Sequence, residues 1–157
     1  MTITVRRFMA IASIMSVVAF SAVALGFSTG IFSLPDTEKS FNEEFNLKYG
    51  QTVTIKDSPL SIHFTDVPED SRCPTDVDCF WEGRVTVTLE IKIDGEIKGT
   101  YNLTPAANPT NQLDIGDGIK IYSIELLDVL PLPVVDQQTP LSDYVIRLVV
   151  KWSYKPD

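Results

Sequence analysis

The residues with the greatest capacity for chemistry gather in one stretch, DVPEDSRCPTDVDCFWEG, from Asp66 to Gly83. It holds both cysteines of the chain, Cys73 and Cys79, with five residues between them. In an exported protein such closely spaced cysteines predict a local disulfide. Closing so short a loop stabilises by about 2 kcal/mol in the chain-entropy model, so the main role we expect for the disulfide is to hold a loop shape.

Arg72 lies in the same stretch among six carboxylates, a local excess of five negative charges. The six are Asp66, Glu69, Asp70, Asp76, Asp78 and Glu82. Because a guanidinium stays charged, Arg72 is expected to form a fork-like pair with Asp70 or a neighbouring carboxylate, which leaves the other acids solvated. The alternative is a calcium site, since Ca²⁺ takes six to eight oxygen ligands. Its candidate ligands are Asp66, Asp70, Asp76 and Asp78, although they lack the EF-hand spacing.

The rest of the sequence offers little for catalysis or for other metals. His63 is the only histidine and all three methionines precede residue 16, which excludes blue-copper and zinc sites. The motif G-x-S-x-G and a phosphate-binding glycine loop are both missing. We therefore predict that the protein is not an enzyme and has no catalytic residues. No cofactor is expected other than the calcium ion of the alternative above.

The cysteine stretch resembles a family of uncharacterised, exported prokaryotic β-domains that carry Asp-Ser-Arg-Cys-Pro, a second Cys and then Trp-x-Gly. The matching residues are Asp70, Ser71, Arg72, Cys73, Pro74, Cys79, Trp81 and Gly83. The preceding pattern Leu60-x-Ile62-x-Phe64-x-x-Val67 is also similar, and the resemblance covers residues 45 to 153. It implies an extracytoplasmic sandwich module without an assigned activity. Many relatives are lipid-anchored through an N-terminal Cys, whereas this chain begins with an uncharged span.

That span predicts export or anchoring. No charged residue occurs from Phe8 through Leu34, and Arg6 and Arg7 stand just ahead. The densest apolar part, residues 8–27, would be about 30 Å long as a helix, which matches a bilayer core and favours an uncleaved transmembrane anchor over a signal peptide. The alternative is a signal peptide, because Ala22-Val23-Ala24 has the small residues of a signal-peptidase site. Cleavage after Ala24 would release a secreted protein.

The arginines ahead of the span and the acidic stretch after it place the N-terminus inside the cell. We therefore expect a single-pass protein of the cell membrane with its C-terminal domain outside. The chain beyond the span holds 11 of the 13 basic residues and all 21 acidic ones, a net charge of −10. Nucleic acid is thus excluded as a partner, and an unknown protein or glycan remains.

Three regions follow from these patterns: a signal anchor or signal peptide over residues 1–34, a polar stalk over 35–44 and a β-domain over 45–157. Apolar residues alternate with period two in the last region, which is typical of strands. Predicted strands cover residues 45–55 with a bend at Gly50, then 60–64, 84–93, 96–103, 119–127 with a bulge between Ile121 and Ile124, and 143–153. Asp94-Gly95 predicts a type I′ hairpin, and Gly116-Asp117-Gly118 predicts a second turn.

About seven strands without helical crossovers predict an all-β fold, an antiparallel immunoglobulin-like β-sandwich preceded by the N-terminal transmembrane or signal helix. A small closed barrel is the alternative. Cys79 and Trp81 share parity with Val85, so we expect the indole and the disulfide to face inward and to pack together. Trp152 is expected inward in the last strand, while His63 has the parity of the solvent face.

The function predicted from the sequence is a membrane-tethered, extracytoplasmic structural or recognition module without catalytic activity. The candidate binding loop comprises Asp70, Arg72, Asp76, Asp78 and Trp81. Two alternatives remain open at this point. One is a calcium-dependent domain that binds carbohydrate or protein, and the other is a secreted hydrolase on a sandwich scaffold.

Overall fold

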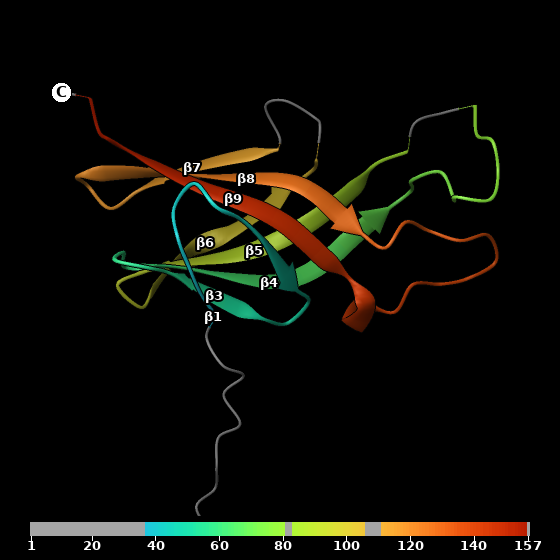
Figure 1. Ribbon diagram of the computed structural model, residues 1–157, viewed down its shortest axis with the longest axis horizontal. Coiled ribbons are helices and arrows are strands. Elements are labelled where there is room, and N and C mark those ends of the chain that lie inside the picture. The colour runs from blue at the N-terminus through green and yellow to red at the C-terminus, as the bar shows by residue number, and fades with distance from the viewer. Residues whose placement is uncertain (1–36, 81–82, 106–110, 157) are drawn as a thin grey trace, which may run out of the picture. The chain divides into compact units, whose positions relative to one another are not determined.

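The computed structural model describes residues 37–80, 83–105 and 111–156. These residues form nine β-strands in two sheets and one short 3₁₀ helix (Figure 1). The elements are β1 (Thr37–Lys39), β2 (Glu44–Lys48), β3 (Thr52–Ile55), β4 (Leu60–Asp70), β5 (Val85–Ile93), β6 (Glu96–Leu103), β7 (Gln112–Gly116), β8 (Lys120–Leu130), the 3₁₀ helix (Leu141–Asp143) and β9 (Val145–Tyr154). The predicted all-β class is confirmed.

The sheets pack as a sandwich, with strand order β1-β3-β4-β5-β6 in one and β2-β9-β8-β7 in the other. Strands β3 to β6 follow one another as antiparallel neighbours, and so do β7 to β9. An immunoglobulin domain changes sheet after its second, third and fifth strands. Here the chain stays in one sheet from β3 to β6, and β1 lies parallel to β3. The predicted immunoglobulin-like topology and the predicted all-antiparallel pairing are therefore wrong. The reason is that the alternation of apolar residues shows which side chains face inward but not which strands pair.

The alternation of apolar residues builds the core. Inward-facing residues of β5 are buried, and those between them are half-buried. Side chains from both sheets meet in one apolar cluster that includes Phe64 and Leu89 on one side and Tyr122 and Leu148 on the other. Among the described residues no polar or charged residue is buried. Hydrophobic burial, at about 25 cal/mol per Å², therefore holds the two sheets together.

Both predicted turns are present. Asp94 and Gly95 connect β5 to β6 with φ values of 55° and 79°. Two consecutive positive φ values are the signature of the type I′ hairpin. The turn at residues 116–118 connects β7 to β8, and Asp117 accepts hydrogen bonds from the backbone N–H groups of Ile119 and Lys120.

Two strands were not expected from the sequence, which is why the described residues contain nine rather than about seven. Residues 37–39 form β1 and pair with β3, so part of the segment predicted to be a stalk belongs to the sheet. Residues 112–116 form β7 against β8. Both are short edge strands. β1 contains no apolar residue, and β7 has only two, Leu113 and Ile115, which are half-buried, so each gives a short pattern.

Two local details differ from the predictions. The bulge in β8 lies between Leu126 and Asp128, later than expected, because the buried face starts at Tyr122 and Ile121 belongs to the other face. Trp152 is 38% exposed. β2 accompanies β9 only as far as the pair Glu44–Val149, so the strand extends past its neighbour before it reaches Trp152.

The predicted N-terminal helix and residues 35–36 of the predicted stalk lie outside the described residues. In the part of the chain that the structure describes, no helix has the length and apolar character needed to cross a membrane.

Candidate functional site

Two long connections leave the sandwich at the same end, one from each sheet (Figure 1). Residues 71–84 connect β4 to β5, and residues 131–144 connect β8 to β9. The described part of the first connection ends at Phe80 and resumes at Gly83. We call residues 71–80 and 131–144 together the paired-loop end.

Hydrogen bonds join the two connections directly. The Thr75 N–H donates to the Pro133 carbonyl over 3.1 Å. The Val135 N–H donates to an Asp76 carboxylate oxygen over 3.2 Å, a bond between residues 59 positions apart in the sequence. The two loops are therefore one structural unit, although each belongs to a different sheet.

Arg72 fastens this unit to the sandwich. Its Nε and Nη2 donate to the two carboxylate oxygens of Asp70 over 2.8 and 2.6 Å, the fork-like pair that the sequence predicted. Nη1 donates to the carbonyl of Val129, and Nη2 also donates to that of Pro131 over 2.8 Å. The side chains of Arg72 and Asp70 are only 13% and 9% exposed. We call this group the Arg72 clamp, and it ties the end of β4 to the end of β8 in the other sheet.

Asp70 has a second side-chain partner, the hydroxyl of Tyr144 just before β9, which donates to it over 3.0 Å. Burial alone would raise the pKa of Asp70, but the hydrogen bonds and charge of Arg72, together with Tyr144, outweigh it and lower that pKa. Burial and the hydrogen bond to the Asp70 carboxylate raise the pKa of Tyr144. Asp70 is therefore a carboxylate held inside the fold, not a free acid or base.

The predicted disulfide between Cys73 and Cys79 is present, with the two Cα atoms 5.9 Å apart. Both cysteines are half-buried in the loop. The expectation that the disulfide faces inward and belongs to the core is therefore wrong. The parity that led to that expectation does not carry over, because β5 begins only at Val85, and residues 83 and 84 are not part of the strand. Trp81 lies outside the described residues, so its predicted packing on the disulfide stays a prediction.

The four candidate calcium ligands are not brought together. Asp66 accepts a hydrogen bond from the neighbouring Val67 N–H, Asp70 belongs to the clamp, and Asp76 binds the second loop. Asp78 is exposed. Within residues 37–80, 83–105 and 111–156, no group of three His, Cys, Asp or Glu side chains could hold a metal ion.

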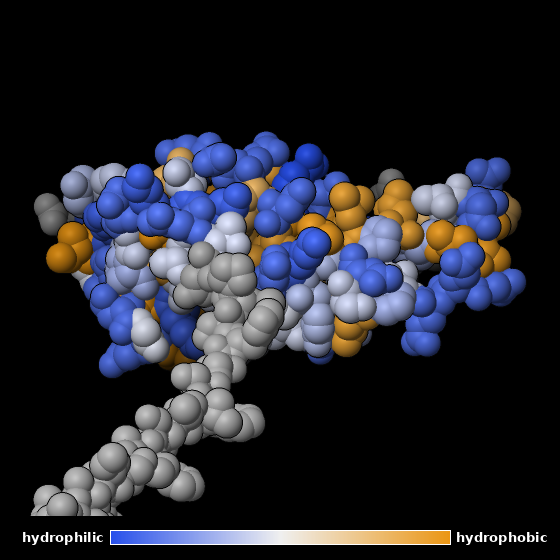
Figure 2. All heavy atoms as spheres, turned by 60° about the horizontal axis from the view of Figure 1, so that its bottom comes forward, coloured by the Kyte–Doolittle hydropathy of each residue, from blue (hydrophilic) through white to orange (hydrophobic). Residues whose placement is uncertain are grey.

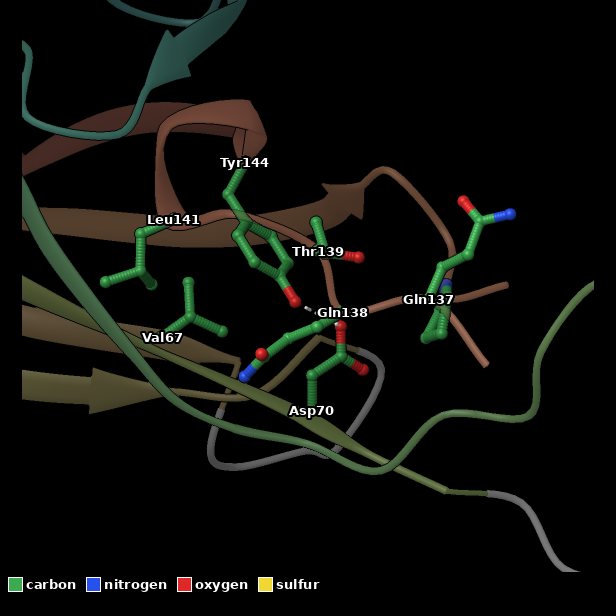
Figure 3. A pocket seen from close by; sticks show the side chains of 8 residues that line it. Val67, Asp70, Gln137, Gln138, Thr139, Leu141 and Tyr144 are labelled. Atoms are coloured by element: carbon green, nitrogen blue, oxygen red, sulfur yellow. Dashed lines mark hydrogen bonds between the residues drawn. The ribbon is translucent and has the colours of Figure 1, made fainter. Parts of the chain in front are cut away.

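A hollow of about 330 Å³ opens between the end of β4 and the second loop. Figure 3 shows Tyr144 pointing its hydroxyl at Asp70 in this hollow, with Leu141 and Val67 on one side. Gln138 extends across the hollow toward Val67, whereas the side chain of Gln137 points away from Tyr144. Pro133 and Thr139 complete the lining.

Exposed apolar side chains project from both loops. Phe80 is fully exposed, and Val77 in the same loop is 45% exposed. At the end of β8 and in the first residues of the loop that follows, Leu130, Leu132 and Val134 are exposed apolar residues. Figure 2 shows orange side chains among blue ones at this right-hand end of the molecule. We call these five residues the apolar loop surface.

The charges left over at this end are negative. Arg72 is paired with Asp70, and Arg84 is paired with Glu69 at 2.9 Å. No lysine or arginine occurs in residues 73–80 or 131–144. The acidic residues of the paired-loop end are Asp76, Asp78, Asp136 and Asp143.

His63 lies in β4, in register with Thr52 and Glu90 of the neighbouring strands. Its side chain is half-buried, and it alternates with the core residues Ile62 and Phe64, as the parity predicted. It does not line the hollow.

The sequence did not indicate the second loop or Tyr144 as parts of the site. The one signal in the sequence for the second loop is its three prolines, at 131, 133 and 140, because proline cannot donate a hydrogen bond within a central strand. The acceptors of Arg72 include two backbone carbonyls, and backbone groups have no sequence signature.

Comparison of the chain with protein-family models, with curated proteins and with solved structures finds no match. The similarity to exported β-domains therefore stays a prediction based on the motif around the two cysteines. The function proposed below depends on the geometry of the paired-loop end.

Proposed function

We propose that this protein is a membrane-tethered, extracytoplasmic recognition module without catalytic activity, and that it contacts a protein partner through the apolar loop surface. One observation carries the proposal. Two loops from different sheets are locked together by the Arg72 clamp, and a disulfide closes the first of them, which holds Phe80 fully in solvent. Exposed apolar side chains on a rigid support are typical of binding surfaces.

The tether and the compartment rest on two features. The uncharged residues 8–34 behind Arg6 and Arg7 have the composition of a membrane anchor. A structural disulfide persists in oxidising compartments and is rare in the cytosol. Both features support a domain held outside the cytoplasm.

The chemistry of the surface indicates the chemistry of the partner. Aromatic and aliphatic side chains at the centre of an interface bury well, and charged residues at its rim steer association. Here the centre is apolar and the rim is acidic, because the two arginines of this end are already paired. We expect a partner with an apolar pocket that accepts Phe80 and with lysines or arginines around it.

The absence of catalysis is supported by the state of the polar groups. Among the eight residues that line the hollow, Asp70 is the only carboxylate, and it is held by Arg72 and Tyr144. A general base must be free to take a proton from a bound substrate. The lining offers no such group.

Photo-crosslinking in the cells of origin tests the proposed contact. A photoreactive amino acid replaces Phe80 in one full-length variant and Ile97 in a control variant, because Ile97 is also exposed but lies in the β5–β6 hairpin. Irradiation should produce a heavier, covalently linked species from position 80. Equal yields from both positions, or no linked species from position 80, would contradict the proposal.

A charge reversal tests the basic rim of the partner. Asp78→Lys places a positive charge beside Phe80 on an exposed residue, so folding should be unaffected. Repulsion from a basic partner should lower the crosslinking yield by about tenfold. An unchanged or raised yield would show that the partner is not basic at this contact.

A further inference from the structure

The hollow between β4 and the second loop has a chemistry different from that of the apolar loop surface. We propose that it binds one neutral sugar residue of a glycan, without a metal ion and independently of the protein contact at Phe80. This site goes beyond the proposed function, because it adds a second class of ligand at the paired-loop end.

Size and openness suit a small ligand. The volume of about 330 Å³ is at the lower limit of the range for ligand-binding pockets. The lining comes from three separate parts of the fold, with Val67 and Asp70 from β4, Gln138 from the loop and Leu141 from the 3₁₀ helix. The Arg72 clamp fixes β4 against this loop, so the hollow is formed before any ligand binds.

The charge balance favours a neutral ligand. Asp70 is the only residue of the lining with an ionised side chain at neutral pH, and the guanidinium of Arg72 lies against both its oxygens. The hollow therefore offers neither an unpaired cation for an anionic ligand nor an unpaired anion for a cationic one. Phosphates, free carboxylates and amines gain no ion pair there.

The hydrogen-bonding groups favour a hydroxylated ligand. In the part of the chain that the structure describes, no hydrogen bond to the Gln138 carboxamide is present, and this group extends across the hollow (Figure 3). A carboxamide both donates and accepts, as sugar hydroxyls do. The Thr139 hydroxyl and the outer edge of the Tyr144–Asp70 pair add further polar groups.

The remaining wall is apolar. Val67, Pro133 and Leu141 line the hollow with carbon atoms. A sugar ring combines hydroxyls around its edge with C–H groups on its faces, so it can satisfy both kinds of wall at once. A purely apolar ligand would desolvate the Gln138 carboxamide without giving it a hydrogen-bond partner, which is unfavourable.

An NMR titration tests the proposal. The full-length ¹⁵N-labelled chain, kept in a detergent without a sugar headgroup, is titrated with glucose, galactose, mannose and N-acetylglucosamine in the presence of EDTA. At least one sugar should shift the amide signals of Gln138, Thr139 and Tyr144 saturably, with a Kd of about 1 mM. No saturable shift from any of the four sugars up to about 50 mM would overturn the proposal.

Adjacent glutamines provide a matched pair of variants. Gln138→Ala should weaken the binding by about tenfold, whereas Gln137→Ala should weaken it much less, because the Gln137 side chain points away from Tyr144 although this residue is also part of the lining. Both are exposed loop residues, and unchanged thermal unfolding of each variant shows that the fold is intact. Equal losses in both variants would overturn the assignment to this hollow.

The two proposals fail separately. Phe80→Ser removes the aromatic group assigned to the protein contact without touching the lining of the hollow. Sugar binding should therefore survive in Phe80→Ser. Loss of sugar binding in this variant would place the sugar at the apolar loop surface and contradict the site inferred here.

Discussion

Arg72 joins the two sheets at the paired-loop end. All three of its side-chain nitrogens donate inside the protein, to Asp70 and to two carbonyls at the end of β8. A side chain so engaged has little left to offer a ligand. Arg72 belongs to the predicted binding loop, and the structure makes it a positioning residue for the neighbours that remain in solvent, above all Phe80.

The clamp predicts a pH-dependent contribution of Asp70 to stability. Its folded-state pKa lies below the ordinary value of 3.8, so the ion pair stabilises the fold fully above that pH, and this contribution is lost as pH falls through the folded-state pKa. Asp70→Asn should lower the free energy of unfolding at pH 7 by about 3 kcal/mol, because it leaves Arg72 without its carboxylate. Urea titrations should show that the difference in unfolding free energy between Asp70→Asn and the unmodified protein becomes smaller below pH 3.8.

Arg72→Lys is the control for this prediction. It keeps the positive charge, but an ammonium cannot present a planar fork to Asp70 and also reach the carbonyls of Val129 and Pro131. Its loss of stability should be smaller than that of Asp70→Asn and should remain at low pH. Equal stability of Asp70→Asn and the unmodified protein at pH 7 would show that the clamp contributes nothing.

At the scale of elements, local covalent and backbone constraints stiffen the two long connections of this fold. The first connection is closed by the disulfide between Cys73 and Cys79, and the second contains three prolines and a 3₁₀ helix. Fixing a loop before binding removes part of the entropy cost of association. The paired-loop end is thus stiff where it is most exposed.

Removal of the disulfide tests this stiffness. The double variant Cys73→Ser and Cys79→Ser should lose about 2 kcal/mol of unfolding free energy, as expected for a loop of this length. Its circular dichroism should stay that of a β-protein, because neither cysteine belongs to the core. Crosslinking from position 80 should fall. Unchanged stability and unchanged crosslinking would contradict a structural role, and reductant treatment of the unmodified protein provides the parallel control.

At the scale of the whole molecule, the sandwich separates stability from recognition. The apolar core occupies the space between the sheets, whereas the candidate sites lie in connections at one end. Loops can change without disturbing such a core, which is why binding residues commonly lie on loops supported by a rigid scaffold.

The membrane tether gives a prediction for the complete chain. Mass spectrometry of the membrane fraction should find peptides from residues 1–24, because the apolar stretch is long enough to span a bilayer. Ala24→Leu removes the candidate cleavage site. If the anchor is uncleaved, the N-terminal region of this variant should differ in mass from that of the unmodified protein only by the substituted side chain. A mature protein that starts at Leu25 would instead show cleavage and secretion.

The sequence predicted individual strands better than their assembly. The limits of β5 and β6 and the hairpin between them follow from strict alternation and from Asp94-Gly95, and the structure confirms them. The edge strand β7 and the bulge in β8 were missed or misplaced, because an edge strand buries little and a bulge depends on the partner strand. In the candidate site, the Arg72–Asp70 pair was predicted because the two residues are neighbours in sequence.

The amino-acid sequence by itself determined the all-β class, the two inward-facing layers and the disulfide, because each depends on the spacing of residues along one short segment. Only the tertiary structure decided that residues 131–144 lie against Arg72, that Tyr144 binds Asp70 and that a hollow opens between them. The physical reason is that these contacts join backbone and side-chain groups more than fifty residues apart. Their meeting depends on how the two sheets stack.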